Sequence, residues 1–194
     1  MMTEKESSKY RMLLESGQRL FWKYGFRRVT IDEICRDADV SKMTFYRFFE
    51  NKIDLAKTIF RNVAEEGIKK FNEVIDSDAA PSEKFKMIIS MKAEGTNDIS
   101  REFLMDFYTS ADTELPMFVE KVTNDLWKEV IAGFRRAQED GWLRKDFKPE
   151  FLFYLSQKLM GMVTDKELLK MYNNQQDLIL EFANFFTYGI SPHD

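Results

Sequence analysis

The sequence predicts an all-α fold of about nine helices, and three observations lead to this prediction. Only 8 Gly and 4 Pro occur in 194 residues, so the turns that a sheet-rich fold needs have few candidates. Apolar residues recur three or four positions apart, which is helical spacing, in one segment after another. Alternating runs of Val, Ile and Thr, the usual sign of strands, are missing. With 44% apolar and 32% charged residues, such a chain can bury a core and stay soluble.

The first two helices are marked by capping residues. An apolar face runs through residues 10–24, and Gly25 suits the left-handed residue that commonly follows the end of a helix. Thr30 is followed three residues later by Glu33, which is the spacing of a capping box. We therefore expect a second, short helix that starts at Thr30 and ends near Asp37.

A tight turn leads to a third and a fourth helix. Asp39 lies in this turn, and Asp tolerates the left-handed conformation better than most residues. Ser41 can cap a short helix over residues 42–49, whose three Phe side chains can anchor inward while its polar side chains face outward. Asn51 resembles the cap of a fourth, longer helix that ends in the loop 76–81.

At least five further helical segments are expected beyond this loop. Serines precede two of them, prolines start two more, and the last ends before a glycine; these markers are Ser82, Ser100, Pro116, Pro149 and Gly189. Proline is favourable in the first turn of a helix, and Gly141 is expected to stop the long helix that starts at Pro116.

Two short helices joined by a tight turn, with a helix packed across them, make a helix-turn-helix, whose second helix enters the major groove of DNA. The segment from Leu13 to Phe60 resembles the DNA-binding region of the TetR family of bacterial transcriptional regulators. The matching residues run without a gap in order and spacing: Leu20-Phe21-x-x-x-Gly25-Phe26, Thr30-Ile31-x-x-Ile34, Ala38-x-Val40-Ser41-Lys42-x-Thr44-Phe45-Tyr46-x-x-Phe49 and Asn51-Lys52-x-x-Leu55. The remaining helices match the family only in number and length.

The resemblance implies contacts with DNA for eight residues. Those at the start of the recognition helix would meet base edges: Lys42, Met43 and Thr44. Those expected to contact phosphates are Thr30, Ser41, Tyr46, Arg47 and Lys52. Two residues depart from the family's pattern. Asp39 replaces the usual glycine of the turn, and Met43 stands where a small residue is favoured and could contact a thymine methyl group.

The resemblance also implies a repressor that binds a palindromic operator as a homodimer and is released by a small, largely apolar effector. Residues 1–52 would form the helix-turn-helix DNA-binding domain, and residues 53–194 a helical ligand-binding and dimerisation domain. The residues that would line the effector pocket, or else pack as ordinary core, are Met87, Met91, Phe103, Phe107, Tyr108, Trp127 and Phe134. The residues that would form the dimer interface, or else complete a monomer's core, are Leu152, Leu155, Leu159, Phe182, Phe185 and Phe186.

The charge distribution agrees with a DNA-facing head, although the net charge is −4. Residues 1–60 carry 12 Lys and Arg against 9 Asp and Glu, whereas the rest of the chain has an excess of acid. Cys35 is the single cysteine, so no internal disulfide can form, and we interpret it as a small buried residue. The N-terminus lacks the apolar stretch of a signal peptide and no segment is apolar enough to span a membrane, so we expect a cytoplasmic protein without a membrane partner.

Two other functions have less support in the sequence. An enzyme is disfavoured because the only histidine, His193, lies next to the C-terminus, and the usual nucleophile, phosphate-loop and zinc motifs are missing. We therefore expect no catalysis, no cofactor and no metal, with carboxylate-only chemistry as the remaining enzymatic alternative. The other alternative is a helical dimerisation or adaptor protein whose helix-turn-helix is structural and has no affinity for DNA. The sequence leaves open whether the regulator represses or activates.

Overall fold

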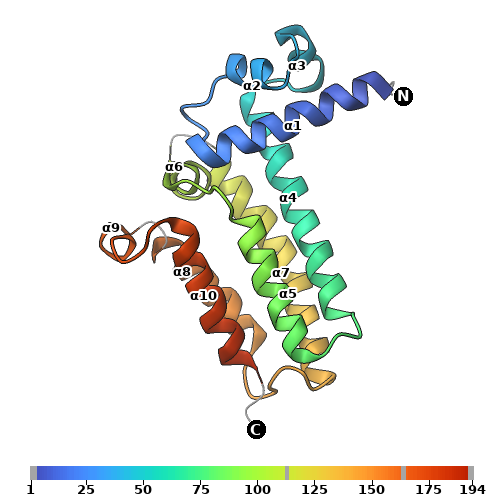
Figure 1. Ribbon diagram of the computed structural model, residues 1–194, viewed down its shortest axis with the longest axis vertical. Coiled ribbons are helices and arrows are strands. Elements are labelled where there is room, and N and C mark those ends of the chain that lie inside the picture. The colour runs from blue at the N-terminus through green and yellow to red at the C-terminus, as the bar shows by residue number, and fades with distance from the viewer. Residues whose placement is uncertain (1–3, 112–113, 163–164, 192–194) are drawn as a thin grey trace. The chain divides into compact units, whose positions relative to one another are not determined.

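A computed structural model describes residues 4–111, 114–162 and 165–191. All regular structure in these ranges is helical, which confirms the all-α prediction (Figure 1). In chain order the helices are α1 (Glu4–Tyr24), α2 (Ile31–Asp37), α3 (Lys42–Phe48), α4 (Lys52–Ile75), α5 (Pro81–Gly95), α6 (Arg101–Leu104), the π-helix η1 (Met105–Thr109), α7 (Leu115–Glu139), α8 (Pro149–Met162), α9 (Lys166–Leu169) and α10 (Gln175–Ile190). No helix in the described ranges is long and apolar enough to cross a membrane.

The chain forms two compact units. Unit 1 consists of residues 1–63 and 98–121, and unit 2 of residues 64–97 and 122–194. Helices α4 and α7 therefore each contribute residues to both units. This division differs from the expected boundary after residue 52, because α6 and η1 return to pack with the N-terminal helices. The assignment of functional domains stays a prediction.

Unit 1 is built around α1, on which α2, α3, α6 and the start of α4 pack. Each of the first four helices contributes a completely buried side chain to its core: Leu13, Phe21, Ile34, Phe45 and Leu55. Where α1 meets α4, a Cβ atom on Gly17 would approach the Cδ1 atom of Ile59 to 2.8 Å. The glycine therefore allows the two helices to lie close together. Cys35 is buried as expected, and burial raises the pKa of its thiol.

An aromatic cluster joins η1 to the rest of unit 1. Phe107 of η1 is completely buried, and its ring centroid lies 4.5 Å from that of Phe103. Phe103 in turn lies 4.3 Å from Trp22 of α1, measured between ring centroids. Phe107 also packs against other rings at centroid distances of 5.9 to 6.4 Å, those of Phe21, Trp22, Phe26 and Phe60. One side chain of η1 therefore contacts α1, the loop after it and α4.

Unit 2 has a core of its own, centred on the turn that follows α7. The buried members of this core are Phe71, Ile75, Phe134, Ala137, Trp142, Leu143 and Ile190. Lys84 of α5 is buried beside them because its Nζ atom donates a hydrogen bond of 2.7 Å to the carbonyl oxygen of Ile75 and lies 4.9 Å from the centre of the Trp142 ring. Helix α5 packs along α10 in the same unit.

Several helix bounds differ from the expected ones. Helix α1 begins at Glu4 rather than near Tyr10, since its first turns are polar and carry the acidic side chains that a helix N-terminus favours. Helix α5 begins at Pro81, and α10 continues through Gly189. The four-residue helix α9, capped by Asp165, was not expected and raises the number of α-helices in the described ranges to ten.

Gly25 makes a testable contribution to unit 1. Its φ is +79°, and a Cβ atom there would lie 2.8 Å from Oδ2 of Asp106 and 2.9 Å from Cβ of Glu102. We expect Gly25→Ala to lower the free energy of unfolding by about 2 kcal/mol or more, because left-handed strain alone costs about 1–2 kcal/mol. Gly67→Ala is the matched control: its Cβ would meet nothing within 4 Å inside α4, so it should stabilise by up to about 1 kcal/mol. Equal urea midpoints for the two variants would contradict this account.

Candidate nucleic-acid interface

Helix α2 is held at its start by the expected capping box. The backbone N–H of Glu33 donates to Oγ1 of Thr30 at 3.2 Å, and the backbone N–H of Thr30 donates to Oε2 of Glu33 at 2.8 Å. These hydrogen bonds with Thr30 hold the pKa of the Glu33 carboxyl below its usual value. Thr30 caps the helix and is also exposed at the surface of unit 1.

The turn between α2 and α3 has the geometry that a helix-turn-helix requires. Asp39 adopts φ +50°, which confirms that the aspartate takes the left-handed position usually held by glycine. The backbone N–H of Val40 then donates to the carbonyl oxygen of Cys35 at 2.9 Å and closes the turn. Helix α3 starts immediately afterwards, with the side chain of Ser41 accepting from the backbone N–H of Thr44 at 3.1 Å.

Helix α3 has a buried face and an exposed face. Phe45 is completely buried and Phe49, directly after the helix, is 3% exposed, so the two rings fix the helix against the core. Met43 is 83% exposed and Tyr46 is 57% exposed, so both large side chains are available to a partner. Lys42 and Arg47 are exposed on the same short helix. The structure therefore brings the predicted DNA-contacting residues of α3 together at the surface.

The two cations of α3 are paired with carboxylates. Nζ of Lys42 lies 2.7 Å from Oδ1 of Asp32 at the start of α2, and the guanidinium of Arg47 pairs with Glu6 of α1. Both Lys42 and Asp32 are more than half exposed, so water weakens their attraction and a phosphate or base edge can compete for the lysine. The sequence did not suggest these pairs, because the partners lie far apart along the chain.

Lys52 has a role that differs from the expected one. Its Nζ atom donates to the carbonyl oxygens of Phe26 and Val29, both at 2.7 Å, and lies 4.2 Å from the centre of the Phe26 ring. Burial lowers the pKa of this ammonium group. The side chain thus fastens the loop before α2 to the start of α4, and its contact with phosphate stays a prediction that would require it to leave these carbonyls.

This geometry agrees with the comparisons to known proteins. The family described as bacterial regulatory proteins of the tetR family matches residues 13–59, from the middle of α1 into α4. The helix-turn-helix regulator YhgD of Bacillus subtilis is 32% identical over 141 residues, which cover 72% of each chain. The chain belongs to the tetR family of bacterial regulatory proteins. It is a helix-turn-helix transcriptional regulator, and α3 is the second helix of its helix-turn-helix.

Solved structures extend the similarity of the regulator over nearly its whole length. FadR of Bacillus subtilis, solved in complex with stearoyl-CoA, matches with a TM-score of 0.64 at 15% identity and covers 93% of this chain and 99% of its own. A regulator from Saccharomonospora viridis, solved in complex with choline, matches with a TM-score of 0.68 at 16% identity and covers 98% of this chain and all of its own. At such low identity these likenesses establish the shared fold.

The residues expected to line an effector pocket are divided between the two units of the regulator. Phe103, Phe107 and Tyr108 belong to unit 1, where the first two are core residues. Burial raises the pKa of Tyr108 to about 12, so its phenol is neutral. The remaining four belong to unit 2: Met87, Met91, Trp127 and Phe134. Among them Met87 is 44% exposed, whereas the others pack in or against the unit 2 core. The assignment of these seven to a pocket stays a prediction.

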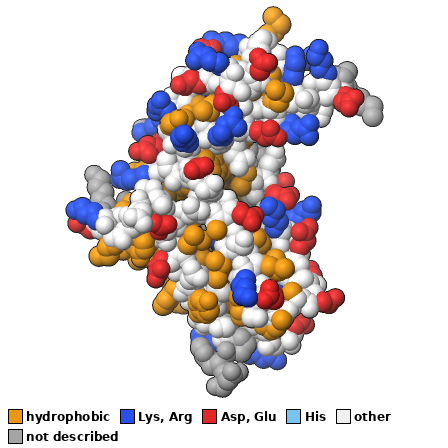
Figure 2. All heavy atoms as spheres, viewed as in Figure 1, with side chains coloured by type: hydrophobic (Ala, Val, Ile, Leu, Met, Phe, Trp, Pro, Cys, Tyr) orange, Lys and Arg blue, Asp and Glu red, His pale blue; other side chains and the backbone are white. Residues whose placement is uncertain are grey.

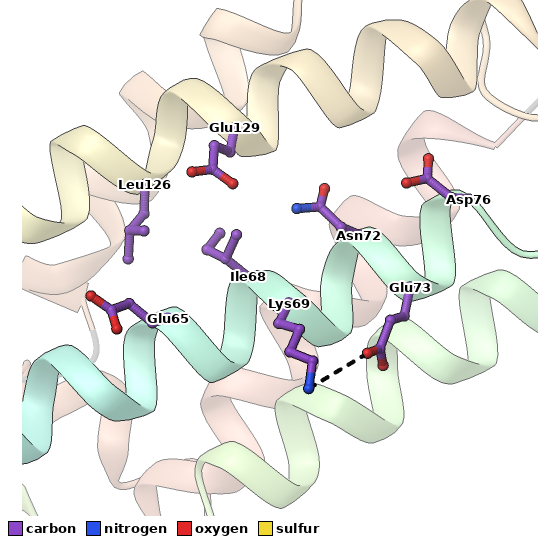
Figure 3. A pocket seen from close by; sticks show the side chains of 8 residues that line it. All are labelled: Glu65, Ile68, Lys69, Asn72, Glu73, Asp76, Leu126 and Glu129. Atoms are coloured by element: carbon purple, nitrogen blue, oxygen red, sulfur yellow. Dashed lines mark ion pairs between the residues drawn. The ribbon is translucent and has the colours of Figure 1, made fainter.

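An open groove that the sequence did not suggest lies in unit 2 between α4 and α7 (Figure 3). It has a volume of about 590 Å³ and is lined by Glu65, Ile68, Lys69, Asn72, Glu73, Asp76, Leu126 and Glu129. The carboxylates outnumber the single lysine, which pairs with Glu73 at 4.0 Å. None of the expected effector-pocket residues lines this groove. Its four carboxylates make it unsuited to an anionic effector.

The last helices of unit 2 expose large aromatic side chains. Phe185 of α10 is 73% exposed, and the other expected interface residues on α8 and α10 are half-buried. Three further aromatic residues that sequence reasoning missed are also exposed: Phe151 and Tyr154 on α8, and Tyr188 on α10. Figure 2 shows apolar side chains at the surface of unit 2 over α10. In the sequence, Phe151 and Tyr154 are three positions apart, as are Phe185 and Tyr188. This i, i+3 spacing puts both rings of a pair on one side of a helix, so it could have indicated the exposed aromatic pairs.

Proposed function

We propose that this regulator is a homodimeric repressor of the cytoplasm that binds a palindromic operator and is released by a small effector. The observation that carries the proposal is the exposed face of α3. It presents a lysine, an arginine, a methionine and a tyrosine on a helix whose aromatic side chains are anchored in the core. The proposal assigns the regulator a binding role without catalysis.

In this proposal the first residues of α3 contact the edges of DNA bases, and its later residues contact the phosphate backbone of the DNA. Lys42 would donate to guanine, Met43 would contact a thymine methyl group, and Thr44 would hydrogen-bond a base edge. Tyr46 and Arg47 would contact phosphates, as would the caps Thr30 and Ser41 and, once released from its carbonyls, Lys52. On binding, DNA replaces Asp32 and Glu6 as the partners of Lys42 and Arg47.

The exposed aromatic residues of α8 and α10 support a homodimer. A palindromic operator presents two half-sites about 34 Å apart, one turn of DNA, and a two-fold dimer carries two heads to match them. Large exposed apolar surfaces on a soluble protein commonly mark sites that a partner covers, and α8 and α10 of unit 2 each expose two large aromatic side chains. The predicted interface residues Leu152, Leu155, Leu159, Phe182, Phe185 and Phe186 would pack with their counterparts in the second subunit.

The proposal that an effector binds this regulator is based on similarity to other proteins of the same fold. Regulators of the same fold have been solved with stearoyl-CoA and with choline, so the fold accommodates ligands of very different size and charge. A ligand can release the operator only to the extent that it binds the DNA-free conformation more tightly. Operator affinity that is unchanged by every candidate ligand would contradict the effector part while leaving the DNA-binding part intact.

The experiment that tests the proposal is selection of genomic DNA fragments with the purified full chain. We expect recovery of one or a few sites with two inverted half-sites, protected from cleavage over about two turns of DNA. Placement of the site over a promoter, and increased transcription when the gene is deleted, would support repression. Binding that stays weak and indifferent to sequence would instead favour an adaptor whose helix-turn-helix is structural.

A further inference from the structure

A second pocket lies in unit 1, apart from the face of α3. It has a volume of about 200 Å³, between the end of α1 and the α6–η1 segment. Three arginines line it, Arg27, Arg28 and Arg101, together with the ring of Tyr24 and the side chain of Met105. Pockets for drug-sized ligands have volumes of about 300–1,000 Å³, so this one suits a smaller molecule.

The arginines of this pocket differ in their partners. Arg27 is engaged by Asp106, which accepts from its backbone N–H at 2.9 Å and lies 3.4 Å from its Nε atom. Arg28 lies over the ring of Tyr24, at 4.4 Å from the ring centre, and makes no ion pair within the described ranges. Its guanidinium is therefore held in place by an aromatic face. It attracts the Glu33 carboxylate, whose pKa it helps to lower, without forming an ion pair with it.

Arg101 is the most informative of the three. It is half-buried, and its Nε–H donor is buried without an acceptor among the described residues. Buried donors in native proteins almost always have an acceptor, and each exception calls for an explanation such as a bound water or ion. Glu102 follows Arg101 in the chain and also lines the pocket, yet no ion pair joins it to either Arg28 or Arg101 in the described part of the chain. With Glu102 and Asp106 counted, the lining carries one net positive charge.

We propose that this pocket binds a small oxyanion, a carboxylate or a phosphate group carried by a metabolite, between Arg28 and Arg101. Both groups have the planar or tetrahedral oxygens that a guanidinium pairs with through two parallel hydrogen bonds. The ring of Tyr24 and the side chain of Met105 offer apolar surface for the few carbon atoms of such a metabolite. Arg27 and Arg28 belong to the loop between α1 and α2, which Lys52 attaches to the start of α4. An anion bound there could therefore affect the position of the helix-turn-helix formed by α2 and α3.

A phosphate of the DNA backbone is the competing occupant, since the loop leads directly to Thr30. The small volume of the pocket favours the small anion over a duplex backbone. Calorimetric titration of the DNA-free protein separates the two occupants and does not depend on the proposed operator.

The experiment titrates the full chain with inorganic phosphate and with succinate, each against sodium chloride of equal ionic strength. We expect saturable binding of at least one anion with Kd of about 1 mM or below. Arg28→Gln and Arg101→Gln should each weaken it by about tenfold or more, since each removes one of the two proposed hydrogen-bonding partners. Arg11→Gln, at an exposed position of α1 outside the pocket, should leave it unchanged.

The melting temperature of each ligand-free variant tests whether that variant is folded. Because Arg28→Gln and Arg101→Gln are independent, the test remains usable if one of the two variants does not fold. The proposal is overturned if neither anion binds saturably up to tens of millimolar, or if binding is equal in the pocket variants and in Arg11→Gln. It is also overturned if the pocket variants lose affinity only for DNA, which would assign the arginines to the DNA backbone.

Discussion

Replacing Phe107 with alanine is expected to lower the free energy of unfolding by about 3–5 kcal/mol, the range for large aromatic side chains removed from a core. The ring is completely buried and contacts five other aromatic rings, from α1, the loop after it, α4 and α6. These neighbours cannot all move inward to fill the cavity, because each is packed against other parts of unit 1. Urea denaturation followed by circular dichroism measures the loss.

Met117→Ala is the control for this prediction. Met117 belongs to α7 in the same unit and is 76% exposed, so its removal creates no cavity. We expect its effect to stay within about 0.5 kcal/mol. A loss below about 1 kcal/mol for Phe107→Ala would mean that η1 packs loosely on the N-terminal helices, contrary to the structure described above.

Introducing charge on the exposed aromatic face of unit 2 is expected to have the largest effect on DNA binding. In Phe185→Glu a carboxylate replaces a ring that is 73% exposed in the single chain and is proposed to be covered in the dimer. Burying an unpaired charge is strongly unfavourable, so the dimer should dissociate. Operator affinity should then fall by about 100-fold or more, because two linked heads gain about 10²–10⁴ over one.

Sedimentation equilibrium and operator binding, measured on the same preparations, test this prediction together. Met117→Glu places the same charge on an exposed methionine of unit 1 and should change neither mass nor affinity. A dimer that persists in Phe185→Glu with full operator affinity would show that the aromatic face of α8 and α10 is not the interface.

The local structure of the head could be predicted from sequence because its signals are short-range. The Thr30–Glu33 box, the left-handed Asp39 and the Ser41 cap each involve residues within three positions of one another. The attachment of Lys52 to carbonyls more than 20 residues away, and of Asp106 to Arg27 across 79 residues, has no such signal. Those contacts depend on how the helices pack, which periodicity does not specify.

The same limit applies to the aromatic residues of the later helices. Phe103 and Phe151 both fall on apolar helical stripes, yet one is 2% exposed and the other 58%. Periodicity identifies the apolar side of a helix but does not tell whether that side meets its own core, a ligand or a second subunit. The candidate effector pocket and dimer interface therefore could be named only as groups of apolar residues.

The central claim is that α3 is the helix that recognises DNA. The most direct test is to measure the operator affinity of Lys42→Ala and of Tyr46→Ala at several salt concentrations. Lys128→Ala is the control, since Lys128 is an exposed lysine of unit 2 that also pairs with a carboxylate, as Lys42 does. We expect Lys42→Ala to lose about 1–3 kcal/mol of operator affinity and to discriminate less between bases at one position, because Lys42 is assigned to a base edge. Tyr46→Ala should weaken binding to all sequences alike, as the loss of a phosphate contact does. Unchanged affinity and unchanged base preference in both variants would contradict the assignment of α3 as the recognition helix.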